Sequence, residues 1–244
     1  MAETIEPRAD DAGDAVAGNA LPGQSRWEAR SAVRVLALRR PGVLERSRRI
    51  VEAAYSLLTD EGLDGLTIRA VLDRSRLSRR AFYERFADKD DLLLAVFEEV
   101  MRITASDYAI QMRKLSDPMD RLRLIVIGVV LGTGSADRPD DPAGSRRAAA
   151  MSREHLRLAQ ARPAELQAAL SPLLTLIEQQ LADGMRAGTF RHDDARRMAA
   201  LIYNLVSTTV HTELLTQKTA RPDWPRRLQL ANDLWEFCRR AVAA

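Results

Sequence analysis

Apolar residues recur three and four positions apart along most of the chain, which is the spacing of amphipathic helices. The clearest stripe consists of Val43, Leu44, Ser47, Ile50, Val51, Ala54, Tyr55 and Leu58. Glu61-Gly62 ends it, because glycine suits the position that follows a helix. No stretch of useful length alternates with the period of two that strands require. The pattern therefore predicts an all-α protein with about nine helices.

Residues that favour helix starts divide this pattern into elements. Thr67 and Ser78 precede two short segments, 68–74 and 79–85, and Asp88 precedes a long helix. The other helices are expected over 118–131 after Asp117, 145–161, 163–187, 195–216 after Asp193 or Asp194, and 226–242. Residues 132–144 predict a loop, 1–25 a disordered acidic arm and 26–42 a short basic helix.

The segment 43–89 has the arrangement of a helix-turn-helix. Two short helices are joined by a turn of a few residues, and the second helix of such a unit enters the DNA major groove. On that helix Phe82 and Phe86 are expected to pack inward against apolar neighbours, while Arg79, Arg80 and Tyr83 face outward, with Glu84 an open candidate for the same outward face. The three arginines of 79–85, together with the tyrosine, suit guanine edges and phosphates.

The distribution of charge favours a polyanionic partner, but the positive excess lies before the two short helices of the predicted helix-turn-helix. The formal net charge is +3, with −4 in residues 1–25 and +6 in residues 26–89. Residues 26–49 hold eight arginines against two acids, whereas 50–89 balance seven bases with seven acids. The excess thus belongs to a basic arm that would attract phosphates without sequence preference. The predicted reading helix is distinguished by its side chains, and not by its net charge.

Composition argues against several other classes of protein. A single cysteine, Cys238, excludes an internal disulfide framework or a zinc site built from a cysteine cluster. The longest apolar run, 124–132, is far shorter than the roughly 20 residues of a membrane span. The acidic first 25 residues lack the apolar core of a secretory signal. We expect a cytoplasmic protein with no membrane partner.

Catalysis is not indicated either. His192-Asp193-Asp194 has metal-ligand residue types, but it precedes a helix, where aspartate caps the first amides. Cys238 lies on an apolar stretch, which favours a small core residue over a nucleophile. No nucleophile–base arrangement or pair of carboxylates stands out. We expect no enzyme activity, no catalytic residue, no metal and no cofactor.

Residues 48–96 resemble the DNA-binding domain of the TetR family of dimeric repressors. The resemblance is carried by Ile50, Ala53, Ala54, Gly62, Thr67, Leu77, Ser78, Phe82, Tyr83, Phe86, Lys89, Asp91, Leu92 and Leu93. A weaker similarity lies at 188–194, before an apolar helix. Two residues depart from the family pattern: Arg76 stands where glycine is usual in the turn, and Leu72 stands where alanine is usual.

The resemblance implies a DNA-binding role for particular residues. Thr67 caps the first short helix near the phosphate backbone, and Arg69 reaches a phosphate or a base edge. Arg79 and Arg80 read bases, and Tyr83 and Lys89 bind phosphates. The full set expected at the DNA is Thr67, Arg69, Arg76, Ser78, Arg79, Arg80, Tyr83 and Lys89. A left-handed Arg76 is strained by roughly 1–2 kcal/mol, so the turn closes differently or a phosphate contact offsets the strain.

The resemblance also implies a C-terminal domain, 90–244, that binds a ligand and dimerises. Helices 195–216 and 226–242 are apolar over more than one face, so they are buried within one subunit or pair with their copies in a homodimer. The candidate ligand residues are Met101, Tyr108, Met112, Ile125, Val129, Leu156, Ile177 and Tyr203, with His155 and His211 as polar anchors. Such residues at helical spacing also suit a plain core, and a largely apolar effector would fit them.

These features favour a ligand-responsive transcriptional regulator. The hypothesis is a repressor that binds a near-palindromic double-stranded DNA operator as a homodimer and is released by a small molecule. One alternative is a helical small-molecule-binding protein whose DNA module has lapsed, which Leu72 and Arg76 keep open. Another is an activator or an architectural DNA-binding protein that uses the basic segment 26–49.

Overall fold

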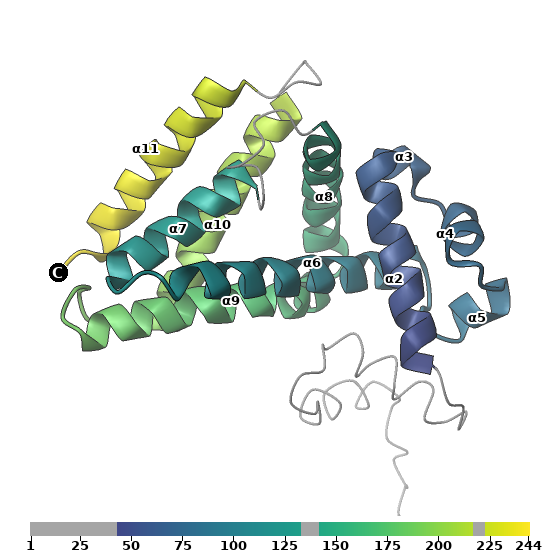
Figure 1. The fold of residues 1–244 in the computed structure, drawn as a ribbon, viewed down its shortest axis with the longest axis horizontal. Coiled ribbons are helices and arrows are strands. Elements are labelled where there is room, and N and C mark those ends of the chain that lie inside the picture. Colours follow the sequence, from purple (N-terminus) through teal and green to yellow (C-terminus); the bar gives the residue numbers. More distant parts are fainter. Residues whose placement is uncertain (1–42, 133–141, 217–222) are drawn as a thin grey trace, which may run out of the picture.

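The computed structural model describes residues 43–132, 142–216 and 223–244, and these residues form ten helices (Figure 1). The expected all-α class is confirmed. The expectations for residues 1–42 and for most of the loop 132–144 lie outside the described residues. In chain order the helices are α2 Val43–Asp60, α3 Gly62–Gly65, α4 Ile68–Ser75, α5 Arg79–Tyr83, α6 Lys89–Met112, α7 Pro118–Leu131, α8 Pro142–Ala161, α9 Pro163–Arg186, α10 Ala195–Thr216 and α11 Trp224–Val242.

Side-chain caps begin the helices where the sequence predicts them. Thr67 and Ser78 each accept a hydrogen bond from the amide three residues on, at 3.1 and 3.2 Å. Asp88 does the same for α6 at 2.8 Å, and Asp194 for α10 at 3.0 Å. Asp117 caps α7, with Pro118 in the first turn. Each cap satisfies an amide that has no partner inside its helix.

Four boundaries differ from the expectation. Gly62 does leave the first helix with a positive φ of 74°, but the chain then forms the short extra helix α3. The recognition helix α5 ends at Tyr83, two residues early. Helix α8 begins at Pro142, inside the expected loop, since proline is tolerated in a first turn. Helix α11 begins at Trp224 because Asp223 caps it.

The helices form a small end and a larger body. Helices α2 to α5 make one end of the molecule, at the right in Figure 1, and the long helices α6 and α9 run side by side through the body. Helix α11 packs on α7, and α10 packs on α9, α8 and α7. Helix α8 contacts α2, α3 and α6, so it links the body to the small end. Every residue from Leu92 to Glu98 in α6 is buried at this junction.

No helix within 43–132, 142–216 and 223–244 combines the length and the apolar character that a membrane crossing requires.

The C-terminus is tied to the turn that follows α9. The Arg191 amide donates to the Val242 carbonyl at 3.0 Å, and Phe190 pairs with Ala243 in an isolated antiparallel bridge. The Phe190 ring, which is 1% exposed, lies against Gly184 of α9. Glycine is needed there because an added Cβ would lie 2.0 Å from Phe190 Cδ2.

We expect Gly184→Ala to lower the free energy of unfolding by about 1–3 kcal/mol, because the well-packed ring must move to admit the methyl group. Urea unfolding followed by circular dichroism measures this change. Thr175→Ala, at an exposed position of the same helix, is the control and should stay within about 0.5 kcal/mol of the wild type. Equal stability of the two variants would contradict the packing argument.

Candidate functional site

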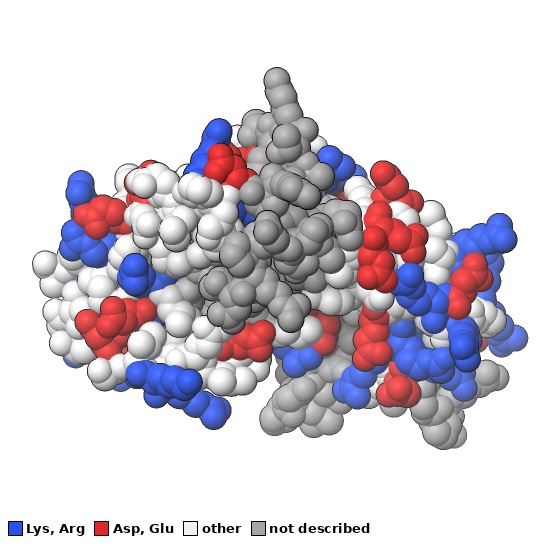
Figure 2. Space-filling view, turned by 45° about the horizontal axis from the view of Figure 1, so that its top comes forward, with Lys and Arg blue, Asp and Glu red and all other residues white. Residues whose placement is uncertain are grey.

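The recognition helix α5 presents three of the predicted DNA-binding side chains to solvent. Arg79 and Arg80 are exposed, and Tyr83 is 49% exposed. Phe82 and Phe86 are buried and hold the opposite side of the segment against the core. Figure 2 shows Lys and Arg side chains gathered at the right-hand end of the molecule, the end that α4 and α5 occupy in Figure 1. The cationic side chains at this end can donate hydrogen bonds to a phosphate backbone or to the acceptor edge of guanine.

Arg85, the third arginine of 79–85, is not part of that surface and does not offer the DNA contact expected of the arginines of this segment. Its side chain is 1% exposed, and its NH1 donates to the Ala81 carbonyl and lies 3.5 Å from a Glu84 carboxylate oxygen. Burial lowers the pKa of the Arg85 guanidinium. A signal for this was present in the sequence, since Arg85 follows Phe82 by three residues and so shares its buried helix face.

The turn between α4 and α5 contains a left-handed arginine. Arg76 has a φ of 54°, and its amide donates to the Leu72 carbonyl. Arg49 of α2 donates from its NH2 to the Ser75 carbonyl, which braces the end of α4. The turn therefore closes in the usual left-handed way with arginine in place of glycine. Nothing in the sequence pattern predicted the brace from Arg49, which comes from a distant helix.

The other predicted DNA-binding residues border the same face. Thr67 and Ser78 are exposed caps, and Arg69 of α4 has a side chain that is 92% exposed. Lys89 begins α6 and is half-buried. Arg74, by contrast, binds the carboxylates of Asp60 at 2.6 Å and Glu61 at 3.0 Å. These contacts hold α4 against the end of α2.

Two ion pairs attach the start of α6 to α8 and to Arg162, the residue between α8 and α9. Arg162 binds Asp88, which also caps α6, and Arg157 binds Asp90 at 2.6 and 3.0 Å. Hydrogen bonds from Arg157 lower the pKa of the Asp90 carboxyl, and the same bonds raise the pKa of Arg157. The residue between these two aspartates is Lys89, so the body reaches directly to the edge of the predicted DNA-binding face.

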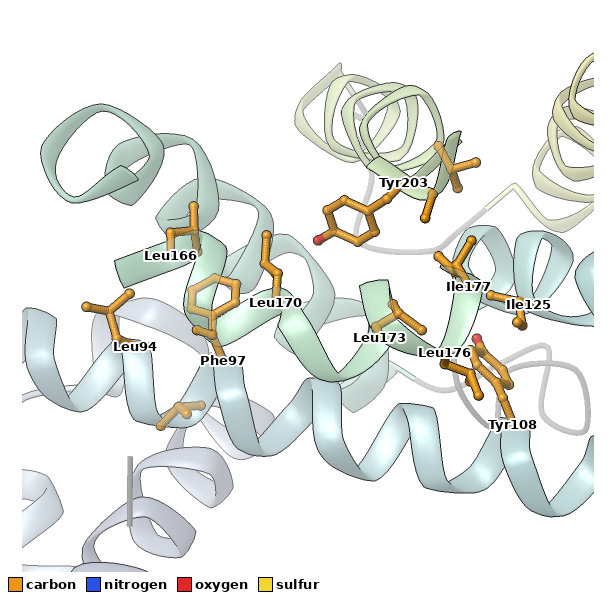
Figure 3. Packing of buried hydrophobic residues seen from close by; sticks show 14 of the residues in the cluster. Leu94, Phe97, Tyr108, Ile125, Leu166, Leu170, Leu173, Leu176, Ile177 and Tyr203 are labelled. Atoms are coloured by element: carbon orange, nitrogen blue, oxygen red, sulfur yellow. The ribbon is translucent and has the colours of Figure 1, made fainter. Parts of the chain in front are cut away.

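The predicted ligand residues fall into three groups. Tyr108, Met112, Ile125, Ile177 and Tyr203 are buried; Met101, Val129, His155 and His211 are half-buried. Leu156 is 41% exposed on α8, so the structure does not bring it to the others. Figure 3 shows Tyr108 beside Ile125, Leu176 and Ile177, while Tyr203 lies beside another part of α9, near Leu170.

The two predicted polar anchors, His155 and His211, lie next to each other. The rings of His155 on α8 and His211 on α10 have centroids 4.6 Å apart, and His155 also lies 6.5 Å from the Tyr203 ring. Burial lowers the pKa of His155. Burial, with the neighbouring His155, lowers the pKa of His211 to about 4. Both imidazoles are therefore neutral near pH 7, and neutral rings both donate and accept hydrogen bonds.

Some buried polar atoms have no hydrogen-bond partner among the described residues. They include the hydroxyl of Tyr108 and the Oε1 atom of Gln180. Burial raises the pKa of Tyr108, so its hydroxyl stays protonated as a donor. A hollow of about 420 Å³ lies between α9 and α10, but none of the ten predicted residues lines it. Its lining includes Ser171, Thr175, Glu178 and Arg196.

The residues considered for catalysis have structural partners. Asp193 binds Arg197, Asp194 caps α10, and His192 is exposed. No group of three or more histidine, cysteine, aspartate or glutamate side chains suited to a metal occurs in the described part of the chain. Burial raises the pKa of the Cys238 thiol to about 11, which disfavours the nucleophilic thiolate.

The small end of the molecule thus has the architecture of a helix-turn-helix domain. Residues 50–96 match the family model described as bacterial regulatory proteins, tetR family. Over these residues the chain is similar to the DNA-binding domain of the TetR family.

Individual proteins are similar to this chain in sequence or in fold. The HTH-type transcriptional regulator HbdR of Aromatoleum sp. (strain CIB) is 30% identical over 80 residues, which are 33% of this chain. The match spans about a third of that relative's length (35%). A TetR-family transcriptional regulator from Pectobacterium atrosepticum has a similar structure, with a TM-score of 0.63, 16% identity, and coverage of 84% of this chain and 97% of that one. FadR from Bacillus subtilis, solved with stearoyl-CoA, has a TM-score of 0.51, 16% identity, and coverage of 78% and 96%.

We expect Arg76→Gly to raise the free energy of unfolding by about 1 kcal/mol, because glycine adopts the left-handed conformation without strain. Urea unfolding measures this. The matched replacement Arg69→Gly, inside α4, is expected to destabilise the protein by roughly 0.5–1 kcal/mol. If both replacements destabilise equally, Arg76 is not strained.

We expect acid to destabilise the protein partly through His211. Because its pKa is about 4 in the folded chain and ordinary in the unfolded chain, the unfolded state binds more protons between about pH 6.5 and pH 4. The free energy of unfolding therefore falls as the pH is lowered through this window. His211→Gln should flatten this dependence in thermal melts, whereas His192→Gln at an exposed position should not. A slope unchanged by His211→Gln would rule out this contribution.

Proposed function

We propose that the protein is a transcriptional repressor that binds a near-palindromic DNA operator as a homodimer and is released by a small molecule. The observation that carries this proposal is the exposed set Arg79, Arg80 and Tyr83 on a short helix whose opposite side is buried. The proposed DNA-binding set is completed by Thr67, Arg69, Arg76, Ser78 and Lys89. Residues 43–89 would form the DNA-binding domain and 90–244 the domain for ligand and partner.

Exposed apolar side chains on the last two helices support the homodimer. Leu201 of α10 is 59% exposed, and Leu228 and Phe237 of α11 are 43% and 63% exposed. These helices bury other residues in their own subunit, so the same helices offer a second apolar face. Pairing that face with its copy would remove these side chains from water. A two-fold dimer would place two α5 helices on successive major grooves, roughly 34–36 Å apart.

The hydroxyl of Tyr108, which has no hydrogen-bond partner in the part of the chain that the structure describes, supports an effector site in the body. A buried polar group without a partner costs about 1–3 kcal/mol, which an acceptor atom on a ligand would recover. Ile125 and Ile177 beside it supply apolar contact, and His155 and His211 supply polar contact nearer α8. The stearoyl-CoA bound by the Bacillus subtilis FadR shows an amphipathic ligand on a protein of similar fold. We propose a largely apolar effector for this chain.

The intact geometry of the helix-turn-helix favours a working DNA-binding domain over a domain that has lost its ability to bind DNA. Both short helices keep their caps, and the turn at Arg76 keeps the left-handed geometry. The half-buried Leu72 is accommodated without loss of either helix. The protein is accordingly proposed to be a regulator and not an enzyme.

Selection of genomic fragments on the purified full chain, followed by sequencing and footprinting, tests the function. We expect one enriched motif with two-fold symmetry and two protected half-sites about one helical turn apart. Effector candidates from the products of neighbouring genes can then be tested for release. Uniform enrichment of all fragments would contradict the proposal and favour an architectural protein, while no saturable binding would favour a lapsed module.

We expect Arg80→Ala and Lys89→Ala to weaken operator binding in different ways. A lost base contact costs roughly 1–3 kcal/mol and relaxes the preference at one position, whereas a lost phosphate contact weakens binding to all sequences and lowers the salt slope by about 1. Gel-shift titrations at several salt concentrations separate the two. Arg113→Ala, on an exposed residue at the far end of α6, is the control and should bind like the wild type.

A further inference from the structure

The two exposed arginines of α5 differ in how they are held. Arg79 has no hydrogen-bond or ion-pair partner among the described residues, so its guanidinium can move. The Nε of Arg80 donates to the Glu84 carboxylate at 3.0 Å, although the Arg80 side chain is 80% exposed. A mobile arginine adapts to a phosphate, whereas a fixed guanidinium suits a target that requires one geometry.

The carboxylate of Glu84 is itself held in place by its contact with a buried residue. Its side chain is only 20% exposed, and its other carboxylate oxygen lies 3.5 Å from NH1 of the buried Arg85. Arg85 in turn donates to the Ala81 carbonyl within the same segment. The Glu84 carboxylate therefore bridges one buried and one exposed guanidinium. Through this bridge the position of Arg80 is tied to the backbone of the recognition segment.

This contact leaves a particular edge of Arg80 free. Because the Nε is bound to Glu84, NH1 and NH2 form the remaining donor pair. Two parallel donors on a fixed arginine match the O6 and N7 acceptors of guanine in the major groove. A carboxylate beside the DNA repels phosphates, so Glu84 suits an arginine that points into the groove and not one that lies on the backbone.

From this arrangement we propose that Glu84 is a positioning residue that orients Arg80 for bidentate recognition of one guanine in each operator half-site. The inference rests on the proposed function and deepens it, because it assigns the base-reading role to Arg80 and leaves Arg79 as the adaptable contact. Glu84 acts through Arg80 and does not itself read the base.

A second acid–arginine pair on the same face serves as a matched comparison. Asp73 and Arg69 of α4 are also four residues apart, but their charged atoms are separated by 3.9 Å and their side chains are 76% and 92% exposed. This pair has no anchor like Arg85 in the described structure. Asp73→Asn and Glu84→Gln therefore remove one negative charge each from the α4–α5 surface, and only the latter removes a fixed contact to Arg80.

The experiment measures base discrimination by competition between the selected operator and variants with each half-site base pair changed. Arg80→Ala identifies the base pair that Arg80 reads. At that pair we expect Glu84→Gln to reduce discrimination by about tenfold, with no such reduction in Asp73→Asn. The double variant Arg80→Ala/Glu84→Gln should lose no more discrimination than Arg80→Ala alone, because the two residues act as one unit.

Glu84→Asp is a second variant that distinguishes a loss of Arg80 positioning from a loss of folding. It keeps the charge beside Arg85 but shortens the side chain by one methylene, so it should reduce discrimination at the same base pair without lowering the melting temperature. Unchanged discrimination in Glu84→Gln and Glu84→Asp would overturn the inference, as would an equal loss in Asp73→Asn or no position-specific loss in Arg80→Ala. Absence of any saturable operator for the wild type would instead contradict the proposed function.

Discussion

The structure depends on the burial of α6 where it enters the body. An amphipathic helix usually buries one face, yet all seven residues from Leu92 to Glu98 are buried, because α2, α8 and α9 surround this part of α6. Helix α6 begins only six residues after Tyr83. The packing of α6 therefore sets the orientation of the proposed recognition helix α5 relative to the body. A displacement of α6 must move both α5 and the helices of the body that contact α6.

Helix α8 gives this junction its electrostatic component. Arg157 of α8 and Arg162, which follows α8, bind Asp90 and Asp88 on either side of Lys89, while His155 of α8 faces α6 and α10. These ion pairs are partly exposed, so each contributes modestly to stability. Their geometric effect is larger, because a displacement of α8 must break them or carry the start of α6 with it.

Local chemistry was enough to predict most of the fold. Thr67, Ser78, Asp88 and Asp117 are caps whose side chains act on amides two or three residues away, so their role could be inferred from sequence. The spacing of Phe82 and Phe86 likewise predicted which side of the recognition segment is buried. The extra helix α3 was missed because it has no side-chain cap and no periodic apolar pattern of its own. The start of α8 at Pro142 was missed because the glycines and prolines of 132–144 favour a loop.

By itself, the sequence determined the all-α class, the helix-turn-helix and the outward face carrying Arg79, Arg80 and Tyr83, since these follow from spacing within a few residues. Only the tertiary structure decided that Arg49 of α2 braces the Ser75 carbonyl at the end of α4. It alone also brought His155 to His211 and left the Tyr108 hydroxyl without a hydrogen-bond partner among the described residues. The reason is that burial and contact between helices depend on the packing of segments far apart in the chain, which local periodicity does not encode.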